Sequence, residues 1–180
     1  SPDGLSDGAV GKIKPFIKDA YLKWSPKGAR NDIYLGISGT PTFSVIEPLW
    51  GYRSVERTLL DLQKLGSTRD FGVAVKGIVP GSDILSYHAM VGNGASTGTE
   101  TNKYKKVYFS AGLKPSLGLN AQGYFDFETR TANSDRITLM GILAYTHEKY
   151  RVGGQFVHQI EKHDEGKDDI TVQGLSVFGA

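Results

Sequence analysis

Polar and apolar residues alternate along most of the chain with a period of two. Between Gly118 and Glu128, one side carries Leu119, Ala121, Gly123, Phe125 and Phe127, and the other carries Asn120, Gln122, Tyr124, Asp126 and Glu128. This period indicates β-strands, because successive side chains of a strand point to opposite faces of its sheet. It predicts nine strands, at residues 14–24, 32–39, 71–78, 84–91, 107–113, 118–128, 137–146, 150–160 and 170–178.

The connections between these strands alternate in length. The connections at 25–31, 79–83, 114–118 and 147–149 are short, whereas those at 40–70, 92–106, 128–136 and 161–169 are longer and polar. An up-and-down barrel with short turns at one end and long loops at the other has this order, and bacterial outer-membrane barrels are built in this way. Crossover connections in a soluble sandwich would mix the two lengths. The order therefore predicts an all-β fold and favours an up-and-down antiparallel transmembrane β-barrel of the outer-membrane kind over a soluble β fold.

The longest connection contains a segment with a helical period. Its apolar residues recur every three or four positions, at Val55, Leu59, Leu62 and Leu65. Ser54 is a suitable N-cap, and Gly66 suits the left-handed residue that often follows a helix. We therefore expect one short helix in this loop.

Two roles fit this helix. It can be a lid that packs on neighbouring loops or subunits, or the loop can fold into the barrel and narrow a pore. A pore loop would place its charges at the constriction, and the candidate residues are Arg53, Glu56, Arg57, Asp61 and Arg69. The polar side of the clearest strand would face the lumen, with Asn120, Gln122, Tyr124 and Asp126 in contact with water and the opposite side in contact with lipid.

Composition removes several classes of function. The chain has 180 residues, which indicates a single domain over 1–180, and its 21 basic and 19 acidic residues give a net charge of only +2. That balance argues against a nucleic-acid binder. Cysteine is absent, which excludes disulfides and thiolate ligands. The phosphate-loop, nucleophile-elbow and zinc-helix motifs are also absent, so we expect no enzyme, no catalytic residues, no cofactor and no metal.

Three segments resemble a known family. They are AYLKW at 20–24, GYRSVERT at 51–58 and STRDFGV at 67–73. In these segments the chain resembles the phosphate-selective porin O and P type family of Gram-negative outer membranes. The resemblance implies a porin through which small hydrophilic or anionic solutes diffuse passively, with outer-membrane lipid around it and a homotrimeric assembly.

Nine strands cannot complete such a barrel. In an up-and-down order the ninth strand runs parallel to the first, so an all-antiparallel barrel needs further strands. We therefore expect residues 1–180 to be an incomplete portion of a larger barrel. An alternative stays open: a soluble β-barrel or sandwich, with its apolar faces turned inward, that binds a small apolar ligand. The period of two fits both architectures.

Overall fold

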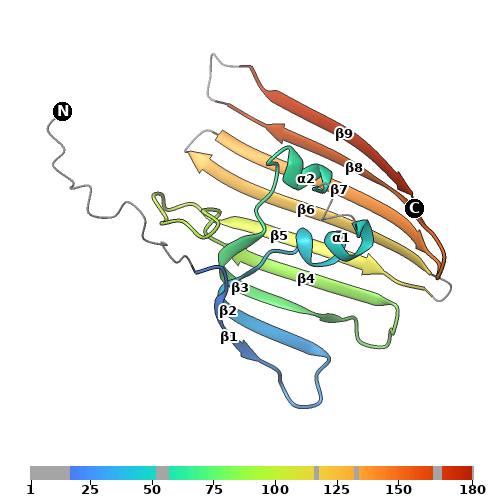
Figure 1. Cartoon of the computed structure of the whole chain (residues 1–180). Helices are drawn as coiled ribbons and strands as arrows, with labels where there is room; N and C mark the ends of the chain where they lie inside the picture. The colour runs from blue at the N-terminus through green and yellow to red at the C-terminus, as the bar shows by residue number, and fades with distance from the viewer. Residues whose placement is uncertain (1–16, 52–56, 116–117, 132–133, 164–167, 180) are drawn as a thin grey trace, which may run out of the picture.

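The computed structural model describes residues 17–51, 57–115, 118–131, 134–163 and 168–179. These residues form nine strands and two helices (Figure 1). The strands are β1 (Ala20–Trp24), β2 (Asn31–Gly39), β3 (Arg69–Ile78), β4 (Leu85–Gly92), β5 (Lys106–Leu113), β6 (Leu119–Thr131), β7 (Ser134–Thr146), β8 (Arg151–Glu161) and β9 (Ile170–Gly179). The helices α1 (Phe43–Trp50) and α2 (Leu59–Leu62) both lie in the connection between β2 and β3.

All nine strands belong to one antiparallel sheet in the order β1 to β9, so each strand pairs with its neighbours in sequence. The all-β prediction and its nine strands are confirmed. The largest error in a strand boundary is at the beginning of β1. Residues 17–19 are not in a strand, and 14–16 lie outside the described residues.

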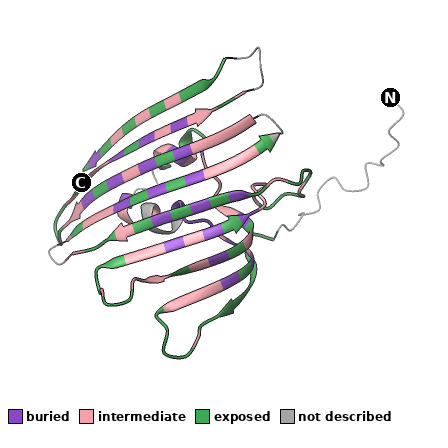
Figure 2. Cartoon of the chain, turned by 180° about the vertical axis from the view of Figure 1, so that it is seen from behind, coloured by how far each residue is buried: buried purple, intermediate pink, exposed green. Residues whose placement is uncertain are grey.

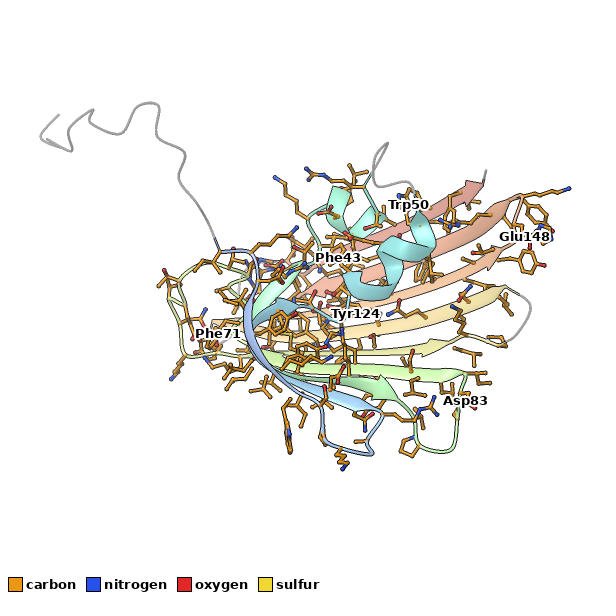
Figure 3. All side chains as sticks on the ribbon, turned by 60° about the horizontal axis from the view of Figure 1, so that its bottom comes forward. Phe43, Trp50, Phe71, Asp83, Tyr124 and Glu148 are labelled. Atoms are coloured by element: carbon orange, nitrogen blue, oxygen red, sulfur yellow. The ribbon has the colours of Figure 1, made fainter. Side chains whose placement is uncertain are left out.

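The predicted alternation of short and long connections fails between β6 and β7. Only residues 132 and 133 separate these strands, where a long loop was predicted at 128–136. The two strands continue to pair beyond the predicted ends, through Thr129 with Asp135 and Thr131 with Ser134, with a register shift between the two threonines. Threonine is β-branched and suits an extended backbone, and a β-bulge absorbs the irregularity. The short turns still share one end of the sheet, as Asp83 and Glu148 show (Figure 3).

Buried and exposed residues alternate along most of the strands (Figure 2), so the two faces of the sheet have opposite character. We call the face against which α1 and α2 lie the covered face. It carries buried residues, among them Tyr34, Met90, Tyr108, Tyr124 and Gln155. We call the other side the open face. It carries exposed apolar residues, among them Leu35, Phe71, Val107, Phe156 and Leu175.

The helices differ from the prediction. A helix was expected from Ser54 to Leu65, but only Leu59–Leu62 is helical, and residues 52–56 lie outside the described residues. The period of three to four arises partly from Leu65, which follows α2 and packs on the sheet without being helical. The longer helix, α1, was not predicted. It ends at Gly51, whose φ of 71° is left-handed and whose N–H donates to the Glu47 carbonyl.

The helices cross only part of the covered face. α1 contacts β6 and β7, and α2 contacts β8 and β9. Leu60 of α2 is completely buried, and the side-chain amide of Gln159 on β8 donates to the Leu65 carbonyl at 3.0 Å. The covered faces of β1 to β4 lie beside α1, and neither helix packs over them as α1 and α2 pack over β6 to β9 (Figure 1).

Glycines let the sheet curve beside α1. Gly36, Gly72 and Gly92 are register partners on β2, β3 and β4. A Cβ atom at Gly72 would lie 2.1 Å from the Val91 carbonyl oxygen, and one at Gly36 would lie 2.3 Å from the Ala20 oxygen. Gly36 also has a φ of 127°, which side chains disfavour. The close approach of these strands therefore requires glycine, and it bends the sheet around the helices.

The sheet has two edges, β1 and β9. In the described part of the chain, no ladder joins them, so the barrel is not closed here. No helix among the described residues is long and apolar enough to cross a membrane.

Candidate functional site: a hollow beside helix α1

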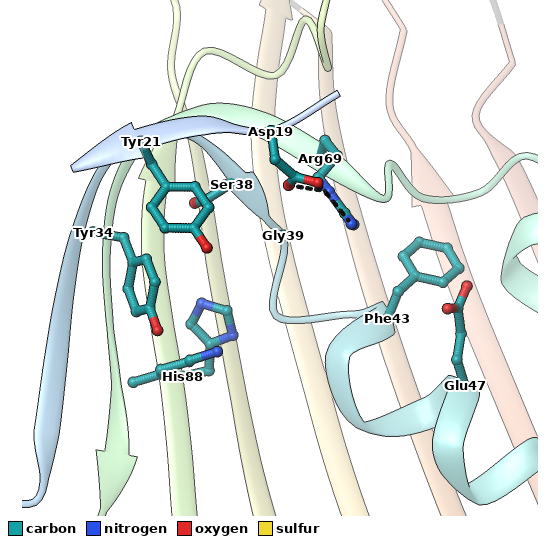
Figure 4. A pocket seen from close by; sticks show the side chains of 10 residues that line it. Asp19, Tyr21, Tyr34, Ser38, Gly39, Phe43, Glu47, Arg69 and His88 are labelled. Atoms are coloured by element: carbon teal, nitrogen blue, oxygen red, sulfur yellow. Dashed lines mark hydrogen bonds and ion pairs between the residues drawn. The ribbon is translucent and has the colours of Figure 1, made fainter. Parts of the chain in front are cut away.

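A hollow of about 480 Å³ lies between α1 and the covered faces of the first four strands (Figure 4). The strands contribute Tyr34, Lys76 and His88, while Phe43 and Glu47 come from α1. The hollow exists because the helices fill the space over β6 to β9 and leave the curved part of the sheet uncovered.

Charges of both signs line this hollow. At the end nearer the long loops, Nε of Arg69 lies 2.6 Å from a carboxylate oxygen of Asp19. Glu47 lines the hollow from α1, and in Figure 4 the Phe43 ring lies between it and Arg69. Lys76 projects from β3 into the same space. Opposite charges that face each other across a narrow aqueous space create a transverse field, which acts on any ion that enters.

An aromatic and cationic group forms the outer wall of the hollow. The rings of Tyr21 and Tyr34 meet edge to face with centroids 5.2 Å apart. Nζ of Lys76 lies 5.0 Å from the Tyr34 ring centroid, within the range of a cation–π contact. Lys23 is bound to Asp32 at 2.9 Å. In the described residues, Lys76 forms no ion pair, so its charge is directed at the ring and at the hollow.

Next to the hollow, the covered face buries a network of charged residues. Lys106 is 2% exposed and lies 3.2 Å from Asp126 and 3.5 Å from Glu128. Glu128 also binds Arg136 at 2.5 Å. The hydroxyl of Tyr124 donates to Asp126 at 2.5 Å.

A third carboxylate joins this network from β3. Asp70 accepts hydrogen bonds from the Tyr108 hydroxyl at 2.7 Å and from the Gly94 N–H at 2.7 Å. These bonds attach the β4–β5 loop to the wall of the sheet. Buried charges in such a network are stabilising only when they are paired and hydrogen-bonded, so the network gives the wall a fixed shape.

The predicted constriction residues are not brought together. Arg69 lines the hollow. Arg57, which is exposed, lies 3.9 Å from the partly buried Asp61 of α2, and neither of them lines the hollow. Arg53 and Glu56 lie outside the described residues.

The four residues predicted to face the lumen all lie on the covered face. Gln122, Tyr124 and Asp126 are buried there. Asn120 is partly buried near the short-turn end and donates to the Gly118 carbonyl at 2.9 Å. The period of two therefore places these side chains correctly on one face. The helices that cover them could not be seen from the period alone.

Of the residues that line the hollow, only Arg69 was among the predicted site residues, and the residues that were missed include Glu47, Lys76 and His88. Lys76 and His88 could have been found, because their positions share a face with Asp70 and Met90 in the strand pattern. Glu47 could not, because Pro48 interrupts a segment that does not read as a helix. Among the described residues, no cluster of three or more His, Asp or Glu side chains could hold a metal ion.

The chain was compared with protein-family models, with curated proteins and with solved structures, and none of the three comparisons gives a match. No family is assigned. The resemblance to the phosphate-selective porin family stays a prediction from the three motifs.

Proposed function

We propose that this chain forms part of the wall of an outer-membrane porin, through which small hydrophilic solutes diffuse passively. One observation carries the proposal: the polarity of the sheet is the reverse of that expected for a soluble protein. Lys106 and Asp126 are 2% and 0% exposed, whereas Leu175 and Val177 on β9 are 74% and 73% exposed.

The exposed apolar residues form a continuous band. They occur on every strand of the open face, from Leu22 on β1 to Leu175 on β9. Soluble monomers rarely expose apolar patches larger than a few hundred Å². A barrel in a membrane requires such a band, because its outer side chains meet lipid while its inner ones meet water. The soluble alternative needs its apolar faces turned inward, whereas the open face of this sheet carries the exposed apolar residues.

The open edges support a barrel with more strands. Edge strands present unpaired backbone groups, which lipid cannot satisfy. β1 and β9 run in the same direction because eight antiparallel steps separate them. An odd number of further strands would therefore close a fully antiparallel barrel. In that barrel the β2–β3 connection lies inside, and the hollow beside α1 is the path for solutes.

Membrane insertion and ion conduction test this proposal together. The complete assembly that contains this chain, purified in detergent, is reconstituted into planar lipid bilayers, and we expect stepwise conductance increases as single pores insert. The outer membrane of a Gram-negative bacterium is the expected location, which fractionation of the producing cells would check. A protein that stays monomeric in detergent-free buffer and gives no conductance steps would contradict the proposal.

A further inference from the structure

A second cavity, of about 290 Å³, lies on the covered face toward the short-turn end, next to the hollow. The two share Lys76 and His88. The walls of the second cavity also include Ser86, Ser110 and Gln122. A polar cavity that adjoins the path for solutes is placed where it can bind one of them.

The cavity owes its space to small side chains. Gly112 lies between Ser86 on β4 and Gln122 on β6 in the register of the sheet. A Cβ atom at Gly112 would lie 2.7 Å from the Ser86 hydroxyl oxygen. Around this floor, Lys76, His88 and Ser110 form a row of register partners on β3, β4 and β5. Ammonium, imidazole and hydroxyl groups from three neighbouring strands therefore line the same cavity.

Two buried side chains in this wall lack hydrogen-bond partners. Gln122 is 4% exposed, and neither its amide nitrogen nor its amide oxygen has a partner among the described residues. His88 is 6% exposed, and its Nδ1 has no partner there either. A buried polar group without a partner costs about 1–3 kcal/mol, so such groups call for an explanation. A ligand that accepts hydrogen bonds would give the Gln122 amide nitrogen a partner.

The charge of the cavity selects the class of ligand. Arg30 is bound to Asp83 at 2.7 Å, and Asp32 is bound to Lys23 at 2.9 Å. Lys76 is left as the one cation in the described cavity wall without an ion pair. A single ammonium group with neutral donors beside it suits a singly charged oxyanion, whereas a phosphate dianion would leave one negative charge unmatched. Ile78 adds an apolar side to the cavity.

We propose that this cavity binds a short-chain monocarboxylate, with its carboxylate at Lys76, Gln122 and Ser110 and its alkyl end against Ile78. The inference rests on the proposed function, since the pore is the route by which the solute reaches the cavity. Such a site would give the pore a preferred class of solute. Without the site, the pore would select solutes only by their size and by the electric field of the charges that line it.

Titration of the detergent-solubilised protein with sodium acetate tests the site. The binding is followed by the NMR line width of the acetate methyl group, with sodium chloride and sodium phosphate as competitors. We expect saturable acetate binding that Lys76→Gln and Gln122→Leu each weaken at least tenfold. Lys114→Gln removes the same charge from an exposed turn and should leave binding unchanged. Gln122→Leu keeps a similar side-chain volume and removes an unpaired amide, so its fold should persist.

Three results would overturn the inference: no saturable acetate binding, equal binding by Lys76→Gln and wild type, or displacement of acetate by phosphate at lower concentration than acetate itself requires. The first would mean that water alone occupies the cavity. Failure of the porin proposal is separable. Acetate binding without bilayer conductance would support the site and contradict the porin proposal. Conductance without acetate binding would support the porin proposal and contradict the site.

Discussion

Trp50 lies edge-on against Phe178, with ring centroids 4.9 Å apart and planes at 69°. This contact joins the last residue of α1 to the end of β9 near the short turns. The β2–β3 connection begins at the opposite end of the sheet, so it crosses the covered face along most of the length of the strands. The β2–β3 connection is therefore attached to the sheet far from the end of β2 where it begins, which makes it an internal part of the fold.

Removing either ring should loosen this attachment. We expect Trp50→Ala and Phe178→Ala each to lower the free energy of unfolding by about 3–5 kcal/mol, because both side chains are buried. The double variant should lose about 0.5–1.5 kcal/mol less than the sum, which is the coupling of an aromatic pair. Urea unfolding in lipid vesicles measures these values. Tyr145→Ala is the control substitution, because Tyr145 packs on Tyr150. Its loss of unfolding free energy and that of Trp50→Ala should simply add in the double variant.

Lys106 should be essential to the buried network. We expect Lys106→Ala to cost about 3–5 kcal/mol, because it leaves the carboxylate of Asp126 buried without its cation, whereas Glu128 keeps its ion pair with Arg136. Lys105→Ala, one residue earlier, removes only an exposed pair with Glu100 and should cost less than about 1 kcal/mol. The comparison uses the urea midpoint of each variant. Similar losses for the two lysines would mean that burial of the network contributes little.

Two half-exposed aromatic residues distinguish the faces. Phe156 on the open face is 48% exposed and Tyr21 on the covered face is 46% exposed. In a membrane, Phe156→Arg should cost about 2–4 kcal/mol near the bilayer centre, while Tyr21→Arg faces water and should cost little. Folding yield into lipid vesicles reports the difference. If both variants fold equally well, the open face does not contact lipid.

Charges across the hollow should set ion preference in opposite directions. Neutralising Glu47 removes a negative charge from the path, so Glu47→Gln should shift reversal potentials toward anion preference. Lys76→Gln should shift them toward cations. Arg57→Gln serves as the control, because Arg57 is bound to Asp61 outside the hollow. If only Arg57→Gln shifted the reversal potential, the constriction would lie at α2 and not at the hollow.

The strand count of the closed barrel is the fifth prediction. Because β1 and β9 run in the same direction, we expect an odd number of strands in addition to these nine. A structure of the assembled pore by electron cryomicroscopy would count them. A barrel closed by direct pairing of β1 with β9 would be a parallel seam and would contradict this expectation.

The strands could be read from the sequence because side-chain alternation is local. A residue such as Phe125 is apolar and its neighbour Asp126 is polar whatever covers the sheet, and the two faces follow from that alone. The period did not reveal which face was inside, since alternation is symmetric between a membrane barrel and a soluble one. The threonines at 129 and 131 extended β6 beyond its predicted end because pairing continued through them.

The site was harder to predict because it depends on contacts between distant segments. Arg57 and Arg69 lie in the same predicted loop, yet only Arg69 reaches the hollow. Glu47 entered the site through α1, whose position is determined by contacts with β6 and β7. Tertiary contacts of this kind leave no period in the sequence.

The sequential order of the strands also bears on how such a wall can change in evolution. Each strand pairs only with its chain neighbours, so duplication of one hairpin inserts two strands without disturbing any existing ladder. A two-strand step preserves strand direction, and with it the side on which each turn emerges. Wider walls can therefore arise by repeated hairpin copying, while the β2–β3 connection keeps its own anchor on the sheet.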